Sequence, residues 1–494
     1  MTEPAKSSRR PRGSVPDEAA AAGYDTAWSA GLPAQGPTWT ARPWANPTVR
    51  AAAGKEARKR VPRASHAAFE PAPGRDPIAI LAGQEADRLQ HLVPLRHERM
   101  AEGPFPYYRG TPAVMASDLA GTPRSDILVQ ASGDAHLSNF GLFASPERTL
   151  VFDANDFDET LPGPWEWDVK RLAASIVIAG RANGLSAARN RVATMATVRS
   201  YRQWMLRYAA MRLIDVWYAH ITDADIREAG ESSGLAQGRA GNARRARLEA
   251  VFTKSRRRDG MRAFESLTAI KDGRRVILED PPFVTRVEVQ GLDRVFTDYR
   301  ASMPESRRDF LERYRFVDFA LKVVGVGSVG TRCFILLLEG RDERDPLILQ
   351  AKEATASVME PYLASSAHGS HGQRVVVGQQ LVQATSDIFL GWTRGTGGRD
   401  FYLRQLWDMK GSVDTTTLEA PGLGFYGGLC GWSLARAHAR TGDAAAISAY
   451  LGTSDTFDGA IADFSETYAD VNARDHKAYL KAIRAGTIST PVDA

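Results

Sequence analysis

The chain has 494 residues, of which 43% are hydrophobic and 24% are charged, a balance typical of globular proteins with a buried core. No run approaches the roughly 18 apolar residues that a membrane span needs, and two cysteines exclude a disulfide framework or a multi-thiolate metal site. The net charge of +5 arises in residues 1–75, which hold 12 basic and 6 acidic residues, whereas the rest holds 51 basic and 52 acidic residues. With no secretory leader in view, we expect a cytoplasmic protein without a membrane partner.

Residues 1–75 are rich in proline, alanine and arginine and show neither a helical nor a strand period. We therefore predict that they form a disordered basic tail. Within this tail, residues 55–63 (KEARKRVPR) are a basic cluster, and four large aromatic residues precede it. These are Tyr24, Trp28, Trp39 and Trp44. Two interpretations stay open: the tail docks on its own domain, or it contacts a partner, nucleic acid included. Outside the tail we expect no nucleic-acid contact, because the remaining chain is nearly neutral.

Residues 76–315 predict a mainly helical lobe that carries two strand-and-loop motifs. The predicted elements, in chain order, are a helix over 78–102, strands over 127–131 and 149–152, an amphipathic helix over 165–182, helices as far as about 267, and a strand within 276–300. The basic stretch 239–262 is either a solvated helix face or a surface for an acidic substrate.

Residues 316–410 predict a small β-rich lobe. Five strand-like runs separated by Gly, Asp and Pro cover 316–325, 333–340, 346–354, 374–384 and 400–408, with a helical candidate over 354–367. Residues 411–494 become helical again and complete the first lobe. The predicted fold class is therefore α+β, with a mainly helical lobe and a small antiparallel five-stranded lobe.

Two polar clusters begin where predicted strands end. In GDAHLSNFG (133–141), Asp134 precedes Asn139 by five residues, and four carboxylates crowd DANDFDE at 153–159. Mg²⁺ prefers one or two carboxylates together with substrate phosphates, whereas a single cluster of this kind is also typical of turns and helix caps. Because two such clusters follow strands close together in the chain, we predict Asn139, Asp153 and Asp156 as magnesium ligands.

Gly325, Gly327 and Gly330 form a Gly-x-Gly-x-x-Gly motif that includes Ser328. In dinucleotide-binding folds this motif opens a helix, but here a second predicted strand follows it. A glycine loop between antiparallel strands covers the ATP phosphates in protein kinases. We therefore predict a nucleotide-binding loop, with a glycine-rich hairpin that binds nothing as the alternative.

Lys352 ends the third predicted strand of the small lobe, in a chain with 11 lysines and 52 arginines. The compact ammonium of lysine suits contact with a phosphate as a point charge. We predict that Lys352 binds the nucleotide; an ordinary lysine at a strand edge is the alternative.

These motifs together resemble those of protein kinases and aminoglycoside phosphotransferase-like enzymes. The resemblance implies that Asp134 accepts the proton of the acceptor hydroxyl, that Asn139 and Asp153 hold metals, and that Asp168 is the structural aspartate of the following helix. The phrase before Asp134 departs from that pattern, because Ser132 and Gly133 stand where the usual histidine phrase would be. In the small lobe, the residues that resemble nucleotide-binding elements are Gly325, Gly327, Ser328, Gly330 and Lys352.

The carboxylate that pairs with Lys352 in the resembled enzymes is expected to be Glu360, while Glu353 should point to the opposite face of its strand. The nucleotide-binding motifs follow the catalytic loop by almost 200 residues, the reverse of the usual order. This order implies a circularly permuted two-lobe fold, in which residues 429–443 resemble the helix that leads into the catalytic loop.

The phrases GDAHLSNFG, FDANDFDETLPGPWEWDVKRLAAS and RQLWDMKGS also closely resemble an uncharacterised bacterial family, domain of unknown function 2252, over roughly residues 76–485. The sequence therefore predicts a phosphotransferase that uses ATP and Mg²⁺ on an unidentified small-molecule or protein acceptor. Two alternatives stay open. One is a metal-dependent phosphoesterase that uses His136 beside the acidic clusters, and the other is a nucleotide-binding pseudokinase without catalysis.

Overall fold

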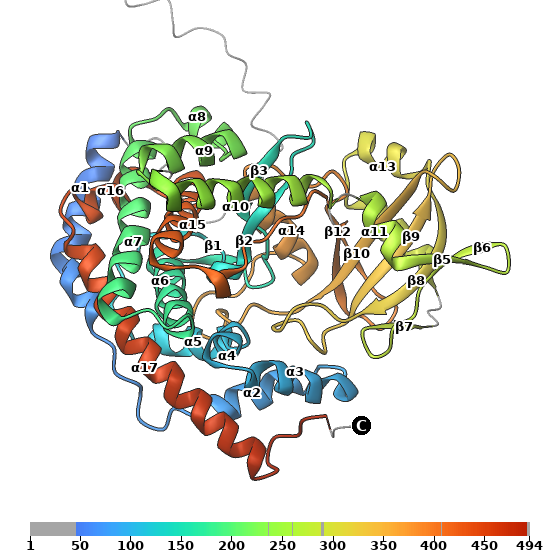
Figure 1. Cartoon of the computed structure of the whole chain (residues 1–494), viewed down its shortest axis with the longest axis horizontal. Helices are drawn as coiled ribbons and strands as arrows, with labels where there is room; N and C mark the ends of the chain where they lie inside the picture. The colour runs from blue at the N-terminus through green and yellow to red at the C-terminus, as the bar shows by residue number, and fades with distance from the viewer. Residues whose placement is uncertain (1–45, 236, 259, 288–290, 407, 492–494) are drawn as a thin grey trace, which may run out of the picture. The chain divides into compact units, whose positions relative to one another are not determined.

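The computed structural model describes residues 46–491 except 236, 259, 288–290 and 407 (Figure 1). Its N-terminal part is helical and leads into two short hairpins. The elements in this part are α1 (Pro47–Arg60), α2 (Pro77–Glu85), α3 (Val93–Ala101), α4 (Pro104–Arg109), α5 (Pro112–Ala120), β1 (Leu128–Ala131), β2 (Phe140–Ala144), β3 (Leu150–Ala154) and β4 (Leu161–Pro164). Antiparallel pairing joins β1 to β4 and β2 to β3, so the Asp134 loop connects two different hairpins.

The predicted disordered tail is wrong for the part of it that the structure describes. Asn46 caps α1 and Pro47 occupies its first turn, where proline is favoured. A Cβ atom at Gly54 would lie 2.0 Å from the carbonyl oxygen of Ala446, so α1 packs through small residues against a later helix. No hydrophobic period marks such a contact, because only Gly54 and Ala57 of α1 are buried. The basic cluster falls at the end of α1, and the four aromatic residues predicted in the tail lie outside the described residues.

Arg75 fixes the end of this N-terminal segment. Its guanidinium donates hydrogen bonds to Asp118 at 2.5 and 2.8 Å and to Asp475 at 2.9 and 2.7 Å. Both carboxylates are almost fully buried. The contact with Asp475 joins residues 400 positions apart, and it explains why composition alone misjudged the segment as a free tail.

The central helical part is built around a helix that sequence analysis placed correctly at 165–182. The helices here are α6 (Trp165–Ala182), α7 (Ala187–Ala209), α8 (Leu213–Tyr218), α9 (Asp223–Ser232), α10 (Gly238–Arg256) and α11 (Gly260–Leu267). Pro164 precedes α6, and every residue from Trp165 to Gly180 is buried. The Trp165 ring stacks on Tyr201 of α7 with centroids 5.7 Å apart, so α6 forms the middle of the main core.

A six-stranded antiparallel sheet forms the second part, not the five-stranded sheet that we predicted. Its strand order is β11-β12-β10-β9-β8-β7. The elements are β5 (Thr268–Lys271), β6 (Arg274–Ile277), β7 (Val284–Arg286), α12 (Leu292–Ala301), α13 (Glu305–Leu311), β8 (Arg315–Lys322), β9 (Cys333–Glu339), β10 (Pro346–Ala354), α14 (His371–Val382), β11 (Gly391–Arg394) and β12 (Asp400–Gln405). The pair β5 and β6 forms a separate hairpin, drawn at the right of Figure 1.

Two of the elements predicted in this part are wrong. The β-branched run 374–384 belongs to helix α14, because Ser370 caps its first turn and Gly372 and Gly378 let it approach Phe401 and Thr160 closely. The predicted helix over 354–367 is irregular instead. Tertiary contacts thus override the local propensity of both segments.

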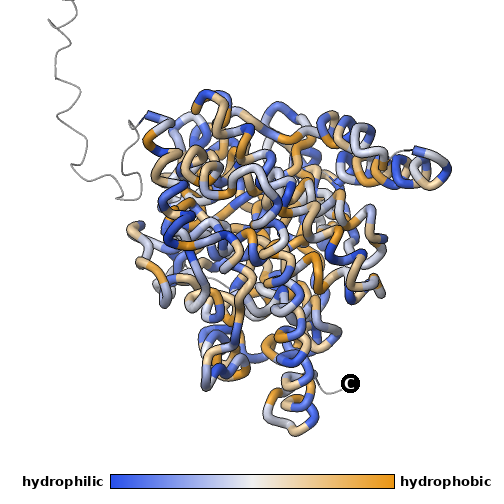
Figure 2. The backbone as a smooth tube through the Cα atoms, turned by 90° about the vertical axis from the view of Figure 1, so that its left-hand side faces the viewer, coloured by the Kyte–Doolittle hydropathy of each residue, from blue (hydrophilic) through white to orange (hydrophobic). Residues whose placement is uncertain are grey.

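Three helices complete the helical part, as the sequence predicted for the C-terminal region. They are α15 (Ala420–Thr441), α16 (Ala444–Leu451) and α17 (Thr456–Arg484). Helix α15 lies against α7, where Cβ atoms at Gly427 and Gly431 would lie 2.1 and 2.5 Å from atoms of Thr197. Hydropathy alternates along the tube in Figure 2, and no helix in the described ranges is long and apolar enough to cross a membrane.

Candidate active site

Helix α6 holds the Asp134 loop through hydrogen bonds with the loop backbone. The carboxylate of Asp168 accepts hydrogen bonds from the backbone amides of Ser132 at 2.7 Å and Gly133 at 2.9 Å. Gly133 has a φ of 78°, and a Cβ atom there would lie 2.5 Å from the carbonyl oxygen of Glu159. Glycine is therefore required before Asp134, and Asp168 occupies the structural position that the sequence predicted for it.

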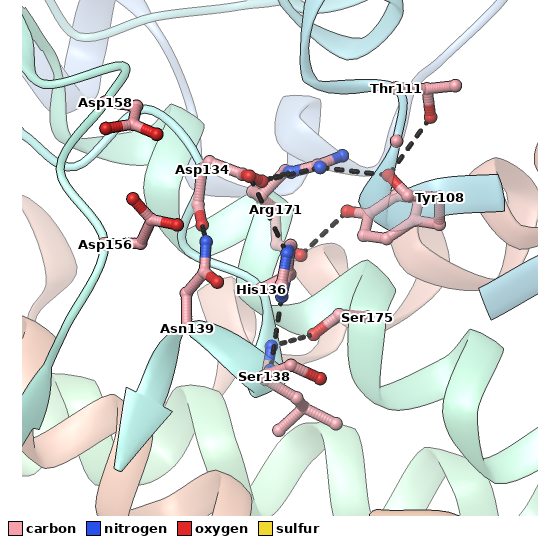
Figure 3. A network of polar contacts seen from close by, with 12 residues as sticks. Tyr108, Thr111, Asp134, His136, Ser138, Asn139, Asp156, Asp158, Arg171 and Ser175 are labelled. Atoms are coloured by element: carbon pink, nitrogen blue, oxygen red, sulfur yellow. Dashed lines mark hydrogen bonds and ion pairs between the residues drawn. The ribbon is translucent and has the colours of Figure 1, made fainter. Parts of the chain in front are cut away.

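Arg171 holds the carboxylate of Asp134, as Figure 3 shows. Its Nε and Nη2 atoms lie 2.8 and 2.6 Å from Oδ1, and its Nη2 also donates to the carbonyl oxygen of Tyr108. Burial raises the pKa of Asp134, and the charge of Arg171 opposes that effect. Because Arg171 engages Oδ1, the second oxygen of Asp134 stays available. Sequence analysis did not select Arg171, although it lies three residues after Asp168 on α6.

Two further residues of the loop fix its shape. Asn139 donates from Nδ2 to the carbonyl oxygen of Asp134 at 2.9 Å, which leaves Oδ1 as its free polar atom. His136 accepts a hydrogen bond at Nδ1 from the amide of Ser138, and its Nε2 lies 3.6 Å from Asp134 Oδ2. Burial lowers the pKa of His136 well below its usual value, so the ring is neutral and stabilises the loop.

The structure engages both carboxylate oxygens of Asp153 with protein donors, whereas we predicted them as ligands of a metal. The side chain of Asp153 is 1% exposed, and both carboxylate oxygens are occupied. Oδ1 accepts from the hydroxyl of Ser433 at 2.6 Å, while Oδ2 accepts from Arg436 Nη2 at 2.6 Å and from the amide of Ala384 at 2.8 Å. These donors come from α15 and from Ala384, two residues after the end of α14. Asp153 therefore joins β3 to the helical core and faces away from solvent.

The carboxylates of Asp156 and Asp158 lie beside the Asp134 loop in Figure 3 and remain partly exposed, at 32% and 28%. Lys352, on β10, places Nζ 2.6 Å from Asp158 Oδ2 and 3.4 Å from Asp156 Oδ1. The hydroxyl of Tyr402 donates to Asp158 Oδ1 at 2.7 Å. Asp158 is thus fixed by two donors, whereas Asp156 keeps more freedom. Lys352 of the six-stranded sheet thus contacts two carboxylates from the segment between β3 and β4.

The pKa values of the two carboxyl groups, Asp156 and Asp158, are shifted in opposite directions. Burial and the neighbouring Asp156 raise the pKa of Asp158. Burial acts the same way on Asp156, but Lys352, Arg404 and Lys410 outweigh it and lower the pKa of Asp156. Burial also acts against the charge of Lys352, but both carboxylates hold its pKa well above its usual value. The ammonium therefore stays charged at neutral pH.

Glu360 does not pair with Lys352, contrary to our prediction. Its Oε1 accepts a hydrogen bond from the backbone amide of Ser357 at 3.3 Å and so closes a local turn. Glu353 points to the opposite strand face, where it binds Arg332 and Arg399. Helix α14 has no acidic residue, and the carboxylate nearest to Lys352 is that of Asp158.

The glycine motif lies between antiparallel strands β8 and β9, as predicted. Cys333, which follows the loop, is paired with Lys352 across the sheet. Residues of the helical part hold the loop: the amide of Leu89 donates to the carbonyl oxygen of Gly330 at 2.7 Å, and Arg99 donates to that of Gly325. A Cβ atom at Gly327 would lie 3.6 Å from the carbonyl oxygen of Arg109. The loop therefore lies next to the segment that carries Arg109.

The site combines carboxylates with several cations. Besides Lys352 and Arg171, it holds Arg404, whose Nη1 donates to the carbonyl oxygen of Asn155 at 3.0 Å, and Arg109, whose charge acts on Asp134. Among the described residues, no group of three or more His, Cys, Asp and Glu side chains is arranged to hold a metal ion. These residue types suit an anionic ligand whose negative charge is neutralised by lysine, by arginine and by one or two cations that the carboxylates bind.

Comparison with known proteins gives one positive result. A family model described as an uncharacterised protein conserved in bacteria, DUF2252, matches residues 88–482. No match was found among curated proteins or among solved structures. The matched range contains the Asp134 loop, both carboxylates beside Lys352, the glycine motif and the six-stranded sheet. Since the match covers most of the chain, the protein belongs to the DUF2252 family of uncharacterised proteins conserved in bacteria.

Proposed function

We propose that this protein is a phosphotransferase that uses ATP and Mg²⁺ and passes a phosphoryl group to an acceptor hydroxyl. The observation that carries the proposal is the position of Lys352. It reaches from the sheet to Asp156 and Asp158, which lie beside the Asp134 loop. Phosphoryl transfer depends mainly on positioning and charge neutralisation, and this site brings together the residue types that provide both.

The oxygen atoms of Asp156 and Asn139 fit a magnesium ion. The carboxylate of Asp156 is partly exposed and has a lowered pKa, so it is ionised at neutral pH. Asn139 keeps Oδ1 free beside it. Mg²⁺ commonly uses one or two protein carboxylates and completes its octahedron with water and phosphate oxygens. Of the three predicted magnesium ligands, the proposal therefore keeps Asn139 and Asp156 and leaves out Asp153.

The glycine loop and Lys352 fit the phosphates of a nucleotide. Gly325 and Gly330 have φ angles of 60° and 85°, so the loop follows a path that favours glycine. Within the described residues, the backbone amides of Gly325, Gly327 and Ser328 donate no hydrogen bond, which leaves them available to phosphate oxygens. Lys352 supplies the charge at the base of this loop.

When bound, ATP supplies the phosphoryl group and Mg²⁺ neutralises its charge. Asp134 is the group that takes the proton of the acceptor hydroxyl, because Arg171 holds its Oδ1 while Oδ2 has only the long contact of 3.6 Å with His136 Nε2. Arg171 also keeps the carboxylate oriented, since its own Nη2 is anchored on Tyr108. The acceptor oxygen would bond to the γ-phosphorus as the bond from that phosphorus to the leaving ADP breaks.

The end of α15 supports a circularly permuted, kinase-like, two-lobe arrangement. A Cβ atom at Gly442 would lie 2.9 Å from the carbonyl oxygen of Leu128, and the amide of Gln130 donates to Thr441 Oγ1 at 3.2 Å. The helix predicted to lead into the catalytic loop therefore ends beside β1, the strand before Asp134. In a chain with the usual order, that junction would be a direct connection.

The test is ATP binding and consumption by the purified full chain. In the presence of Mg²⁺, ATP should raise the stability of the wild-type protein by about 2.7 kcal/mol at a hundredfold excess over its dissociation constant. Lys352→Met should lose this stabilisation and all ATP consumption. The matched control is Lys481→Met, which removes an exposed lysine of α17 and should change neither.

Wild-type ATP consumption by Lys352→Met would contradict the proposed mechanism. Magnesium-dependent ATP binding without any phosphoryl transfer, even to the protein itself, would indicate a nucleotide-binding module instead. Hydrolysis of a phosphate ester with Mn²⁺ and without ATP would indicate a phosphoesterase.

A further inference from the structure

A second cavity, outside the candidate active site, lies between α9, α10, the β2–β3 hairpin and the start of α15. Its volume is about 580 Å³, within the range of small-molecule sites. Its lining is mostly apolar and includes Phe152, Ile226, Leu248, Val251, Phe425 and Leu429. A cavity of this size and lining suits the apolar body of a ligand.

Three arginines of α10 line this cavity, Arg244, Arg245 and Arg247, and Arg244 is the least exposed of them. Arg244 lies one turn before Leu248 and two turns before Val251, so the three side chains share a helix face. The polar contacts of Arg244 with described residues are both long. Nη1 lies 3.5 Å from the carbonyl oxygen of Leu235, and Nη2 lies 3.8 Å from the exposed carboxylate of Glu419. Both contacts are weak at these distances, so the guanidinium can exchange them for a carboxylate that it binds bidentately.

The neighbouring charges are engaged differently. Arg227 forms two short hydrogen bonds with Glu249, at 2.6 and 3.1 Å, and Arg245 binds Glu231 at 2.9 Å. These pairs neutralise each other at the rim. The side chain of Arg247 is exposed. Arg244 is thus the lining cation best placed to select the head group of a ligand whose apolar part fills the cavity.

The cavity shares a wall with the loop that carries Asp134. Tyr426 lines it and donates its hydroxyl to the carbonyl oxygens of Leu137 and Phe140, at 3.1 and 3.0 Å. Leu142 also lines it and forms two backbone hydrogen bonds with Gly411, both at 2.8 Å. A ligand in the cavity therefore contacts Tyr426 and Leu142, whose hydrogen bonds help to hold residues 137–142 in place.

We propose that this cavity binds an amphipathic carboxylate of the fatty-acid type, with its chain among the apolar side chains and its head group on Arg244. Binding also stabilises residues 137–142 through Tyr426 and Leu142. The site is independent of the proposed phosphotransferase activity, because none of its lining residues belongs to the ATP site.

The experiment is calorimetric titration of the full chain with decanoate, kept below the concentration at which it forms micelles, and with decanol as the uncharged comparison. Wild-type protein should bind decanoate saturably and more tightly than decanol. Arg244→Gln should weaken decanoate binding about tenfold, the loss expected for one charge-assisted contact, and leave decanol binding unchanged. Arg239→Gln, an exposed arginine on the same helix, is the matched control and should have no effect.

Leu248→Trp should fill the cavity and abolish binding of both ligands. Hydrogen exchange of the amides in residues 137–142 should slow when decanoate is added to the wild type, and it should not slow in Arg244→Gln at the same concentration. Absence of decanoate binding, or decanoate binding that Arg244→Gln and Leu248→Trp leave unchanged, overturns the site. Equal affinity for decanol and decanoate overturns the head-group assignment, and unchanged exchange overturns the link to the loop.

Discussion

The two halves of the segment 153–159 show how one residue type serves different purposes three positions apart. Asp153, at the end of β3, is sealed by Ser433, Arg436 and the amide of Ala384. Asp156 lies in the following loop and is 32% exposed beside Lys352. A carboxylate whose oxygens all accept hydrogen bonds from protein donors has no oxygen left for a metal, whereas a partly exposed carboxylate can still bind one. The comparison teaches that a polar residue near the end of a strand can be part of the buried core, whereas a residue in the following loop stays accessible to a ligand.

The largest expected effect is the loss of stability on Asp153→Ala. Removing one partner of a buried ion pair leaves the guanidinium of Arg436 uncompensated and typically costs about 3–5 kcal/mol. Urea unfolding should show this loss. Asp156→Ala is the matched control, with a change below about 1 kcal/mol. Equal stability losses in the two variants would remove the distinction between the two halves of the segment.

A pH-dependent effect is expected next, at the end of the segment. Burial raises the pKa of Glu159 to about 7 from its usual 4.5. Between pH 4.5 and pH 7 the carboxyl group of Glu159 keeps its proton in the folded protein and releases it in the unfolded chain. The contribution of Glu159 to stability is therefore present below pH 4.5 and is lost as the pH rises through 7. The full shift corresponds to about 3 kcal/mol, and residual solvent exposure reduces it.

Glu159→Gln should therefore stabilise the protein at pH 8 and have little effect at pH 4.5. Its amide oxygen can still accept the hydrogen bond that Val358 now donates to the carboxylate. Thermal unfolding at several pH values measures the difference. A stability difference that is constant across this range would show that Glu159 titrates as it does in solution.

A smaller effect is expected from Asp158→Asn. Lys352 would lose its 2.6 Å carboxylate partner and keep only Asp156, at a cost of about 2 kcal/mol. Because the ammonium would shift toward Asp156, nucleotide affinity should fall together with stability. Tyr402→Phe removes only the second donor to Asp158 and should cost about 1 kcal/mol. A Tyr402→Phe variant less stable than Asp158→Asn would show that the tyrosine, not the lysine, is the main partner.

The smallest stability effect, and the sharpest functional one, is expected for Asp156→Asn. The substitution removes the attraction between Asp156 and Lys352 together with the repulsion between two carboxylates, and it keeps the side-chain shape, so stability should change by less than about 1 kcal/mol. The increase in stability that ATP causes in the presence of Mg²⁺ should disappear, and thermal unfolding with and without Mg²⁺ measures it. If Asp156→Asn keeps that increase, Asp156 is not a metal ligand.

Local spacing was sufficient for much of the fold and for part of the site. The helix at 165–182 was predicted at its observed bounds, because Pro164 and a continuous apolar period mark it. The glycine hairpin and the strand that carries Lys352 were also correct, since β-branched runs and glycines signal them directly. The structural role of Asp168 was implied by the resemblance to protein kinases, and its carboxylate accepts two backbone hydrogen bonds.

Other features depend on contacts between distant segments, which no local pattern records. Asp153 is held by residues about 280 positions away, and Lys352 meets Asp158 across about 194 positions. Residues 46–75 and α14 are ordered by partners that a composition or a propensity does not reveal. The amino-acid sequence thus specified which residue types surround the site, and the tertiary structure decided which carboxylate faces the lysine. The physical reason is that spacing sets the direction of the backbone, but the donors that surround a carboxylate come from the whole fold.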